Sequence, residues 1–297
     1  MSAVPPPPAP EPRPKTTRPP VAAIVLTQDE AAHILPCLRT LQWAREIVVV
    51  DSGSTDGTPE LARTLNARVV HHAWVGWAGQ RNFALTQVSL PWVLFVDADE
   101  RVPLDLAEEM IACIEKSSIE VTTSLERTAI DERAASENER DGTPAGFWVP
   151  RQNVILGHWV RHAGWSPDYQ LRLFRRERGR YDPARPVHEL VQLDGRTACL
   201  DRRLVHHNYA SWRQFWSKQR RYAGAEAGAL AAQGTRAKAR NFVLQPCREF
   251  RRRYWTLQGH RAGALGLGLC LVLALANLQM YVELWRLNHR DTATAPR

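Results

Sequence analysis

The residues best suited to chemistry are Asp97 and Asp99, which end the apolar segment WVLFVDADE and are separated by one residue. Alternate side chains of a β-strand point to the same face, so both carboxylates would leave the end of such a strand on one side. Carboxylate oxygens are hard ligands that hold Mg²⁺ or Mn²⁺, usually together with water and phosphate oxygens of a substrate. This pair therefore predicts a divalent-cation site for a phosphorylated ligand.

Predicted strands and helices alternate along the chain around this pair. Segments with helical spacing separate apolar runs of strand length, which cover residues 21–26, 46–51, 67–74 and 92–97. This alternation predicts an α/β fold with a mainly parallel sheet flanked by helices. Ligands of such sheets bind beyond the carboxyl ends of the strands. The polar segments 27–30, 51–57 and 97–100 follow strands there, so we expect them to form one site.

Charge and cysteine content narrow the class of protein. The net charge of +8 is concentrated at one end, because residues 201–297 carry 17 basic and 5 acidic side chains. A basic end favours an anionic partner such as a phosphorylated substrate, a nucleic acid or a membrane surface. The five cysteines are widely spaced and form no CxxC pair, which argues against a disulfide framework or a zinc site. We interpret them as small core residues.

Four segments taken together resemble a known family. VAAIVLTQDE, EIVVVDSGSTDGT, GQRNFAL and WVLFVDADE are similar, in order and spacing, to the nucleotide-sugar half of family 2 glycosyltransferases, which have the Rossmann-like GT-A fold. RQNVILGHWVRHAGWSPDYQLRLFRR and the VHE at 187–189 resemble a narrower group, the lipopolysaccharide core β-1,4-glucosyltransferases. The resemblance covers residues 21–209 and implies a metal-dependent, inverting hexosyltransferase with a nucleotide-sugar donor.

The resemblance also implies roles for individual residues. Those placed at the donor nucleotide and its diphosphate are Thr27, Glu30, Asp51, Arg81, Asp97 and His188. Asp99 would bind the metal ion, Mg²⁺ or Mn²⁺, with Asp97 beside it. A UDP-sugar is the expected donor, although Ser52 stands where the family often carries a second acid and leaves the choice of base open.

An inverting transfer also needs a base for the acceptor hydroxyl. The candidates are Asp168 in WSPDYQ and Glu189 in VHEL. We favour Glu189, by resemblance to related enzymes with a His-Glu pair, and otherwise assign Asp168 to substrate positioning. Trp159 and Trp165 could equally stack on a sugar or be buried aromatic residues. We interpret the histidines without helical ligand spacing as structural or surface residues: His162, His206 and His207.

The carboxy-terminal part of the chain predicts membrane association. Residues 262–276 carry no polar side chain, and 262–285 as a helix would measure about 36 Å against a hydrocarbon core of about 30 Å. Five arginines between 248 and 261 precede this segment and suit an anionic leaflet. An interfacial or re-entrant helix and a single span both fit. A helix pair packed on the catalytic domain is the alternative.

These features predict three regions. Residues 1–20, with nine prolines, form a disordered tail; 21–210 form the GT-A catalytic domain, with a polar insertion at 115–146; and 211–297 form a basic, helical, membrane-associated region. We expect a transferase on the cytoplasmic side of the inner membrane that moves a hexose, foremost glucose, to a lipid-linked saccharide such as lipopolysaccharide core. Transfer to polyprenyl phosphate, a glycosidase and a nucleic-acid-binding protein are the alternatives, although we expect no nucleic-acid partner.

Overall fold

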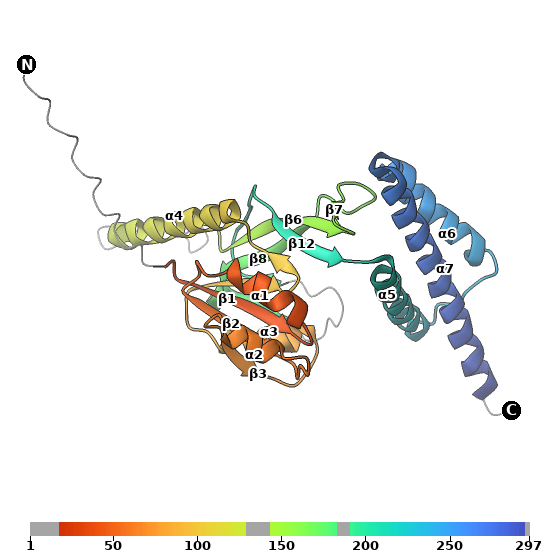
Figure 1. Cartoon of the computed structure of the whole chain (residues 1–297), viewed down its shortest axis with the longest axis horizontal. Helices are drawn as coiled ribbons and strands as arrows, with labels where there is room; N and C mark the ends of the chain where they lie inside the picture. The colour runs from red at the N-terminus through yellow and green to blue at the C-terminus, as the bar shows by residue number, and fades with distance from the viewer. Residues whose placement is uncertain (1–17, 129–142, 183–190, 295–297) are drawn as a thin grey trace, which may run out of the picture.

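The structure of the protein, a computed structural model, describes residues 18–128, 143–182 and 191–294 (Figure 1). Most of the proline-rich segment 1–20 lies outside these residues, and so do His188 and Glu189. The described chain forms a large sheet with helices on its faces, followed by three carboxy-terminal helices at one side (Figure 1).

Four parallel strands form the first half of the sheet. β1 (Val21–Thr27) lies between β2 (Glu46–Asp51) and β4 (Trp92–Asp97), and β3 (Arg68–His71) lies beyond β2. Thr27 is in register with Asp51, and Leu26 with Asp97, so the three strands end side by side. The predicted parallel order is therefore confirmed here, and it brings the polar strand ends to one edge.

Helices cover both faces of these strands, and the side chains of β1 show why. Val21, Ala23 and Val25 are buried on the face covered by α1 (Ala31–Arg39), α2 (Thr58–Arg63) and α4 (Leu104–Thr128). Ala22 and Ile24 are buried on the other face, which α3 (Trp77–Thr86) covers. A strand buried on both faces has the continuous apolar pattern from which this half of the sheet was predicted.

The helix α4 extends into the segment predicted to be a polar insertion. Leu106, Met110 and Ile114 recur at helical spacing and are buried against the sheet, so the helix begins as a core element. It then continues to Thr128. The first part of the 115–146 segment is therefore helical, and residues 129–142 lie outside the described chain.

The second half of the sheet is mixed rather than mainly parallel. Antiparallel pairs join β4 to β8 (Tyr169–Arg175) and β8 to β6 (Gly146–Ile155); β6 then runs parallel to β12 (Leu204–Tyr209). Shorter strands complete it: β5 (Glu100–Arg101) pairs with β12, and β7 (His158–Trp159) and β11 (Thr197–Cys199) pair with β6. β9 (Gly179–Tyr181) and β10 (Val191–Leu193) form a separate pair. No helix lies between β6 and β8 along the chain, and antiparallel strands need no crossover helix.

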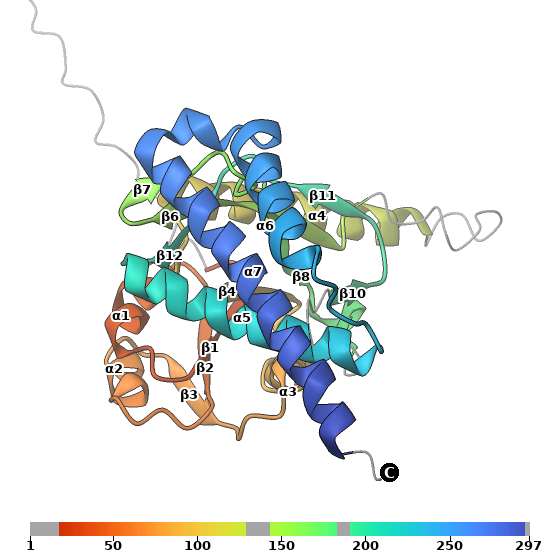
Figure 2. The ribbon, with the colours of Figure 1, turned by 90° about the vertical axis from the view of Figure 1, so that its right-hand side faces the viewer.

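Three helices follow the sheet: α5 (Trp212–Ala232), α6 (Asn241–Arg251) and α7 (Gly263–Thr294), with a π-helical turn (Arg252–Thr256) and a 3₁₀ turn (Gly259–Ala262) before α7. α7 crosses α5 and packs against it (Figure 2). Leu269 and Leu273 of α7 share a cluster with Phe215 of α5 and Tyr209 of β12. Within the described chain, one helical stretch, Gly259–His289, is long and apolar enough to cross a membrane.

Candidate active site

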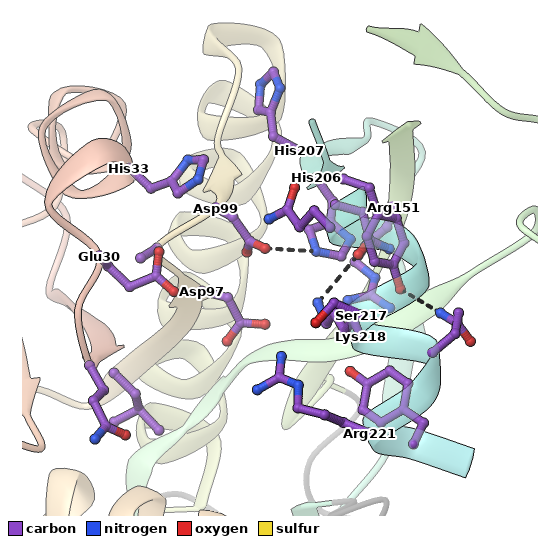
Figure 3. Close-up of a pocket in the computed structure, with 18 of the residues that line it drawn as sticks. Glu30, His33, Asp97, Asp99, Arg151, His206, His207, Ser217, Lys218 and Arg221 are labelled. Carbon is purple, nitrogen blue, oxygen red and sulfur yellow. Dashed lines mark hydrogen bonds and ion pairs between the residues drawn. The ribbon is translucent and has the colours of Figure 1, made fainter. Parts of the chain in front are cut away.

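A polar cavity of about 1360 Å³ lies at the carboxyl ends of β1 and β4. Five of the residues predicted at the site line it: Thr27, Glu30, Arg81, Asp97 and Asp99. The opposite wall comes from α5, whose Ser217, Lys218 and Arg221 face the carboxylates across the cavity (Figure 3). The fold therefore brings these strand-end residues together, as the parallel half of the sheet requires.

The Asp97 carboxylate is held by two arginines. Arg172 of β8 donates from Nη2 to Oδ2 at 2.5 Å and from Nη1 to Oδ1 at 3.4 Å, and Arg81 Nη2 lies 4.0 Å from Oδ1. Burial acts to raise the pKa of Asp97, but the two guanidinium groups outweigh it and hold the pKa well below the usual range. Asp97 is therefore a fixed anion whose oxygens are already partly occupied.

Asp99 faces a histidine that the sequence did not reveal as a site residue. Its Oδ2 lies 3.4 Å from Nε2 of His206 on β12. The His206 Nδ1 lies 2.8 Å from Oδ1 of Asn153, whose amide nitrogen donates to Trp165 O and to Asp168. Nδ1 therefore carries a proton that it donates to Asn153, and Nε2 is the ring nitrogen that faces Asp99.

A carboxylate oxygen and an imidazole nitrogen that face each other suit a divalent cation between them. Burial acts to raise the pKa of Asp99, but the hydrogen bond and charge of His206 lower it, which keeps the carboxylate ionised. No cluster of three or more His, Cys, Asp or Glu side chains suited to a metal occurs among the described residues. Asp99 and His206 would hold a cation whose remaining ligands come from substrate and water.

A network of ion pairs around the buried Glu100 holds the end of β4, which carries Asp97 and leads to Asp99. Glu100 accepts from Arg172 Nη2 at 2.6 Å through Oε1, and from the backbone N–H of Asp97 at 2.9 Å through Oε2. Arg151 Nη1 lies 3.5 Å from Glu100, and Arg151 Nη2 lies 2.8 Å from Asp168. Burial raises the pKa of Glu100, against the opposing effect of Arg172. The network links β4, β5, β6 and β8 and fixes where β4 ends.

Asp168, one of the two candidate bases, is engaged on both oxygens. Oδ2 accepts from Arg151 Nε and from Asn153 Nδ2, both at 2.9 Å, and Oδ1 accepts from Gln170 Nε2 at 3.0 Å. Burial acts to raise its pKa, but Arg151 and the amide donors hold it below the usual value. Asp168 does not line the cavity. Its hydrogen bonds orient Arg151 and Asn153. Glu189, the other candidate, lies outside the described residues.

Asp51 lies behind the cavity and organises the loop after β2. It is buried and accepts from Thr27 Oγ1 at 3.2 Å and from the backbone N–H groups of Gly53 and Ser54 at 3.0 Å. Gly53 has a φ of 93°, which favours glycine in this turn. Ser52, rather than Asp51, lines the cavity. The structure thus places Asp51 as a loop anchor.

Glu30 and Arg81 line the cavity near the two aspartates. Burial, together with the charge of Asp99, raises the pKa of Glu30 to about 7. The Arg81 guanidinium, on α3, lies 5.6 Å from the ring centroid of Phe95 and 5.4 Å from that of Tyr181. This aromatic support directs Arg81 toward Asp97, where its planar fork suits a phosphate or a base edge.

The remaining aromatic and histidine residues divide between cavity and surroundings. Trp165 lines the cavity and packs edge-on against Tyr209. Trp159 does not line it, and the guanidinium groups of Arg161 and Arg203 lie 3.7 and 5.1 Å from its ring centroid. His207 lines the cavity beside His206, whereas His162 does not.

Parallel strands that present carboxylates to a cavity at their carboxyl ends are typical of nucleotide-binding α/β proteins. The model of Glycosyl transferase family 2 matches residues 22–178, which include both carboxylates, Arg81 and Arg172. The chain belongs to this family. Its sheet is the GT-A fold, as expected, with a helical carboxy-terminal extension.

Two relatives extend the comparison. The lipopolysaccharide core biosynthesis glycosyltransferase LpsC of Rhizobium meliloti (strain 1021) is 30% identical over 253 residues, which cover 83% of this chain and 85% of that protein. An uncharacterized glycosyltransferase of Rickettsia bellii (strain RML369-C) is 40% identical over 91 residues, which cover 30% of this chain and 31% of that protein. The likeness to LpsC therefore extends well beyond the part that the family model matches.

Solved structures give weaker likenesses. S. aureus TarS (residues 1–349) is 18% identical with a TM-score of 0.39, and the match covers 93% of each chain. Glucosyl-3-phosphoglycerate synthase from Mycobacterium tuberculosis, solved with Mn²⁺ and UDP, is 24% identical with a TM-score of 0.28 and covers 31% of this chain and 38% of that one. TM-scores this low add nothing to the family assignment.

Proposed function

We propose that this protein is an inverting hexosyltransferase that transfers a sugar, foremost glucose from UDP-glucose, to a lipid-linked saccharide such as lipopolysaccharide core. The observation that carries the proposal is the facing pair Asp99 and His206 beside the arginine-held Asp97, in one cavity at the strand ends. The similarity to LpsC, which is described as acting in lipopolysaccharide core biosynthesis, supports the choice of acceptor.

The donor would lie across the ends of β1, β2 and β4. Arg81 would bind a phosphate or the base, and Asp97, fixed by Arg172, would accept hydrogen bonds from the ribose. Asp99 and His206 would hold Mg²⁺ or Mn²⁺. When bound, such a cation neutralises the charge that develops on the nucleoside diphosphate leaving group. The Asp97 oxygens already accept hydrogen bonds from Arg172, and we therefore assign Asp97 to the donor rather than to the cation.

The base is assigned by what Asp168 already does. An acid whose two oxygens accept hydrogen bonds from Arg151, Asn153 and Gln170 has little capacity left for a proton. We therefore keep Glu189 as the proposed base, with His188 beside it at the diphosphate. Glu189 would take the acceptor hydroxyl proton as the oxygen attacks the anomeric carbon and the diphosphate leaves with the bonding electron pair.

We also propose that the protein associates with the cytoplasmic face of the inner membrane, and the exposed side chains of α6 and α7 support contact with a membrane. Leu267, Leu271 and Leu275 recur every four residues on α7 and are 40, 47 and 52% exposed. Exposed arginines on α6, Arg248 and Arg251, add a cationic border that suits anionic lipid. The opposite side of α7 is buried against α5 and the sheet. Because one side of α7 packs against the protein and the other side is exposed, a helix that lies in the membrane surface is favoured over one that crosses the membrane.

A transfer assay tests the proposal. Purified protein with Mn²⁺ and radiolabelled UDP-glucose should label a truncated lipopolysaccharide, and EDTA should abolish the labelling. A glycosidase needs no metal ion, so its activity would survive EDTA. Labelling of polyprenyl phosphate instead would favour the second candidate acceptor, which the apolar, basic α6–α7 surface also suits. If no nucleotide sugar were consumed with either acceptor, the enzymatic proposal would fail.

A further inference from the structure

The helix α5 turns one polar face to the cavity and one apolar face away from it. Most of its cavity-lining side chains recur at helical spacing along the helix, namely Gln214, Ser217, Lys218, Arg221 and Tyr222; Arg213, Gln219 and Ala225 line the cavity as well. Phe215, Ala223 and Ala227, on the other side, are buried against neighbouring elements, α7 among them. The polar stripe is thus the wall that faces Asp97 and Asp99 (Figure 3).

This wall carries three cationic side chains that form no ion pair with any described residue. Arg213, Lys218 and Arg221 line the cavity, and no described carboxylate lies within ion-pair distance of any of them. The acid on α5, Glu226, does not line the cavity. On the sheet side, by contrast, Arg172 is paired with two acids. Clustered cations at an open polar cavity favour an anionic ligand.

We propose that the α5 wall binds an anionic group, a phosphate or a carboxylate, on the acceptor saccharide. This inference rests on the proposed function and names the chemistry of its acceptor. The donor nucleotide and diphosphate already have partners at the strand ends, and in an inverting transfer the acceptor approaches from the side opposite the leaving group. The wall across the cavity from the carboxylates is therefore the acceptor's side.

Replacing Arg221 distinguishes binding of the acceptor from binding of the donor. Lys218 Nζ lies 3.4 Å from Asn208 Oδ1, and Asn208 shares β12 with His206. Lys218 is therefore close to the proposed metal ligands Asp99 and His206. Arg221 lies almost one turn further along α5 and lines the same cavity. Arg220, its exposed neighbour, does not line the cavity and provides a matched control with the same charge.

Isothermal titration calorimetry of the full chain with lipopolysaccharide core oligosaccharide tests the inference. The oligosaccharide is used intact, after removal of phosphate, and after reduction of its carboxylates, so that the two sources of anionic charge are distinguished. We expect one of the two treatments to weaken binding by about 10- to 100-fold, the effect of losing charge-assisted hydrogen bonds. Arg221→Ala should weaken binding of the intact form equally and abolish the discrimination, Arg221→Lys should retain part of it, and Arg220→Ala should have no effect.

The inference is overturned if all three forms bind wild-type protein equally, or if the intact form does not bind. It is also overturned if Arg221→Ala weakens the binding of UDP-glucose with Mn²⁺ and leaves oligosaccharide binding unchanged, because the cations would then serve the donor. Failure of the proposed function appears separately, as absence of sugar transfer by a wild-type protein that still distinguishes the oligosaccharides by charge.

Discussion

Replacing Arg172 by methionine tests the buried network on which the geometry of the site depends. The Arg172 side chain is 5% exposed and binds Asp97 at 2.5 Å and Glu100 at 2.6 Å. Methionine fills similar volume but leaves the buried Glu100 and the partly exposed Asp97 without their shared cation. Breaking a buried pair in this way costs about 3–5 kcal/mol in the free energy of unfolding. The melting temperature should fall by about 6–20 °C for a domain of this size.

Urea denaturation followed by circular dichroism measures the change. Arg176→Met is the matched control, because Arg176 pairs with an exposed acid, Glu177, and its loss should cost at most about 1 kcal/mol. Adding Glu100→Gln to Arg172→Met should recover part of the loss, since one uncompensated charge disappears. A cost for Arg172→Met no larger than that of the control would refute the network as a source of stability.

Three further outcomes are expected. Glu189→Gln should lower kcat by about 10²- to 10⁴-fold with donor affinity unchanged, whereas Asp168→Asn should mainly destabilise the fold; steady-state kinetics contradict the assignment if Asp168→Asn shows the kcat loss instead. Asp51→Asn should cost about 1–3 kcal/mol at pH 7. Because hydrogen bonds from Ser54 and Gly53 outweigh burial and lower the Asp51 pKa, the wild-type stabilisation is present above about pH 4 and lost as the pH falls; equal acid sensitivity in variant and wild type would disprove this. Leu271→Asp should weaken sedimentation with anionic liposomes, and an unchanged bound fraction would exclude the α7 surface.

The parallel half of the sheet could be predicted because each strand there is buried on both faces and followed by a helix. A continuous apolar run such as residues 21–26 is stable as a strand buried on both faces, and its carboxyl end must lie beside those of its neighbours. For that reason Thr27, Asp97 and Asp99 were placed in one site from local sequence alone. The same reasoning could not decide that Asp51 holds a loop behind the cavity, because a strand-end acid can point either way.

The partners of the aspartates could not be predicted, because they come from strands far away in the sequence. Arg172 and His206 lie on β8 and β12, and only the mixed second half of the sheet brings them to the end of β4. His206 also lacks the helical ligand spacing by which metal-binding histidines are often found. A usable signal exists in LVHHNY, where a strand pattern directs alternate side chains inward and so points one of the two histidines at the core.

In the proposed site, Asp99 and His206 hold a divalent cation together with the donor diphosphate. Calorimetric titration of UDP into the protein, with and without Mn²⁺, tests this most directly. The wild type should bind UDP at least about tenfold more tightly with Mn²⁺, and Asp99→Asn should remove that difference while Asp201→Asn, an exposed acid that does not line the cavity, keeps it. The same Mn²⁺ dependence in Asp99→Asn as in the wild type would contradict the assigned site.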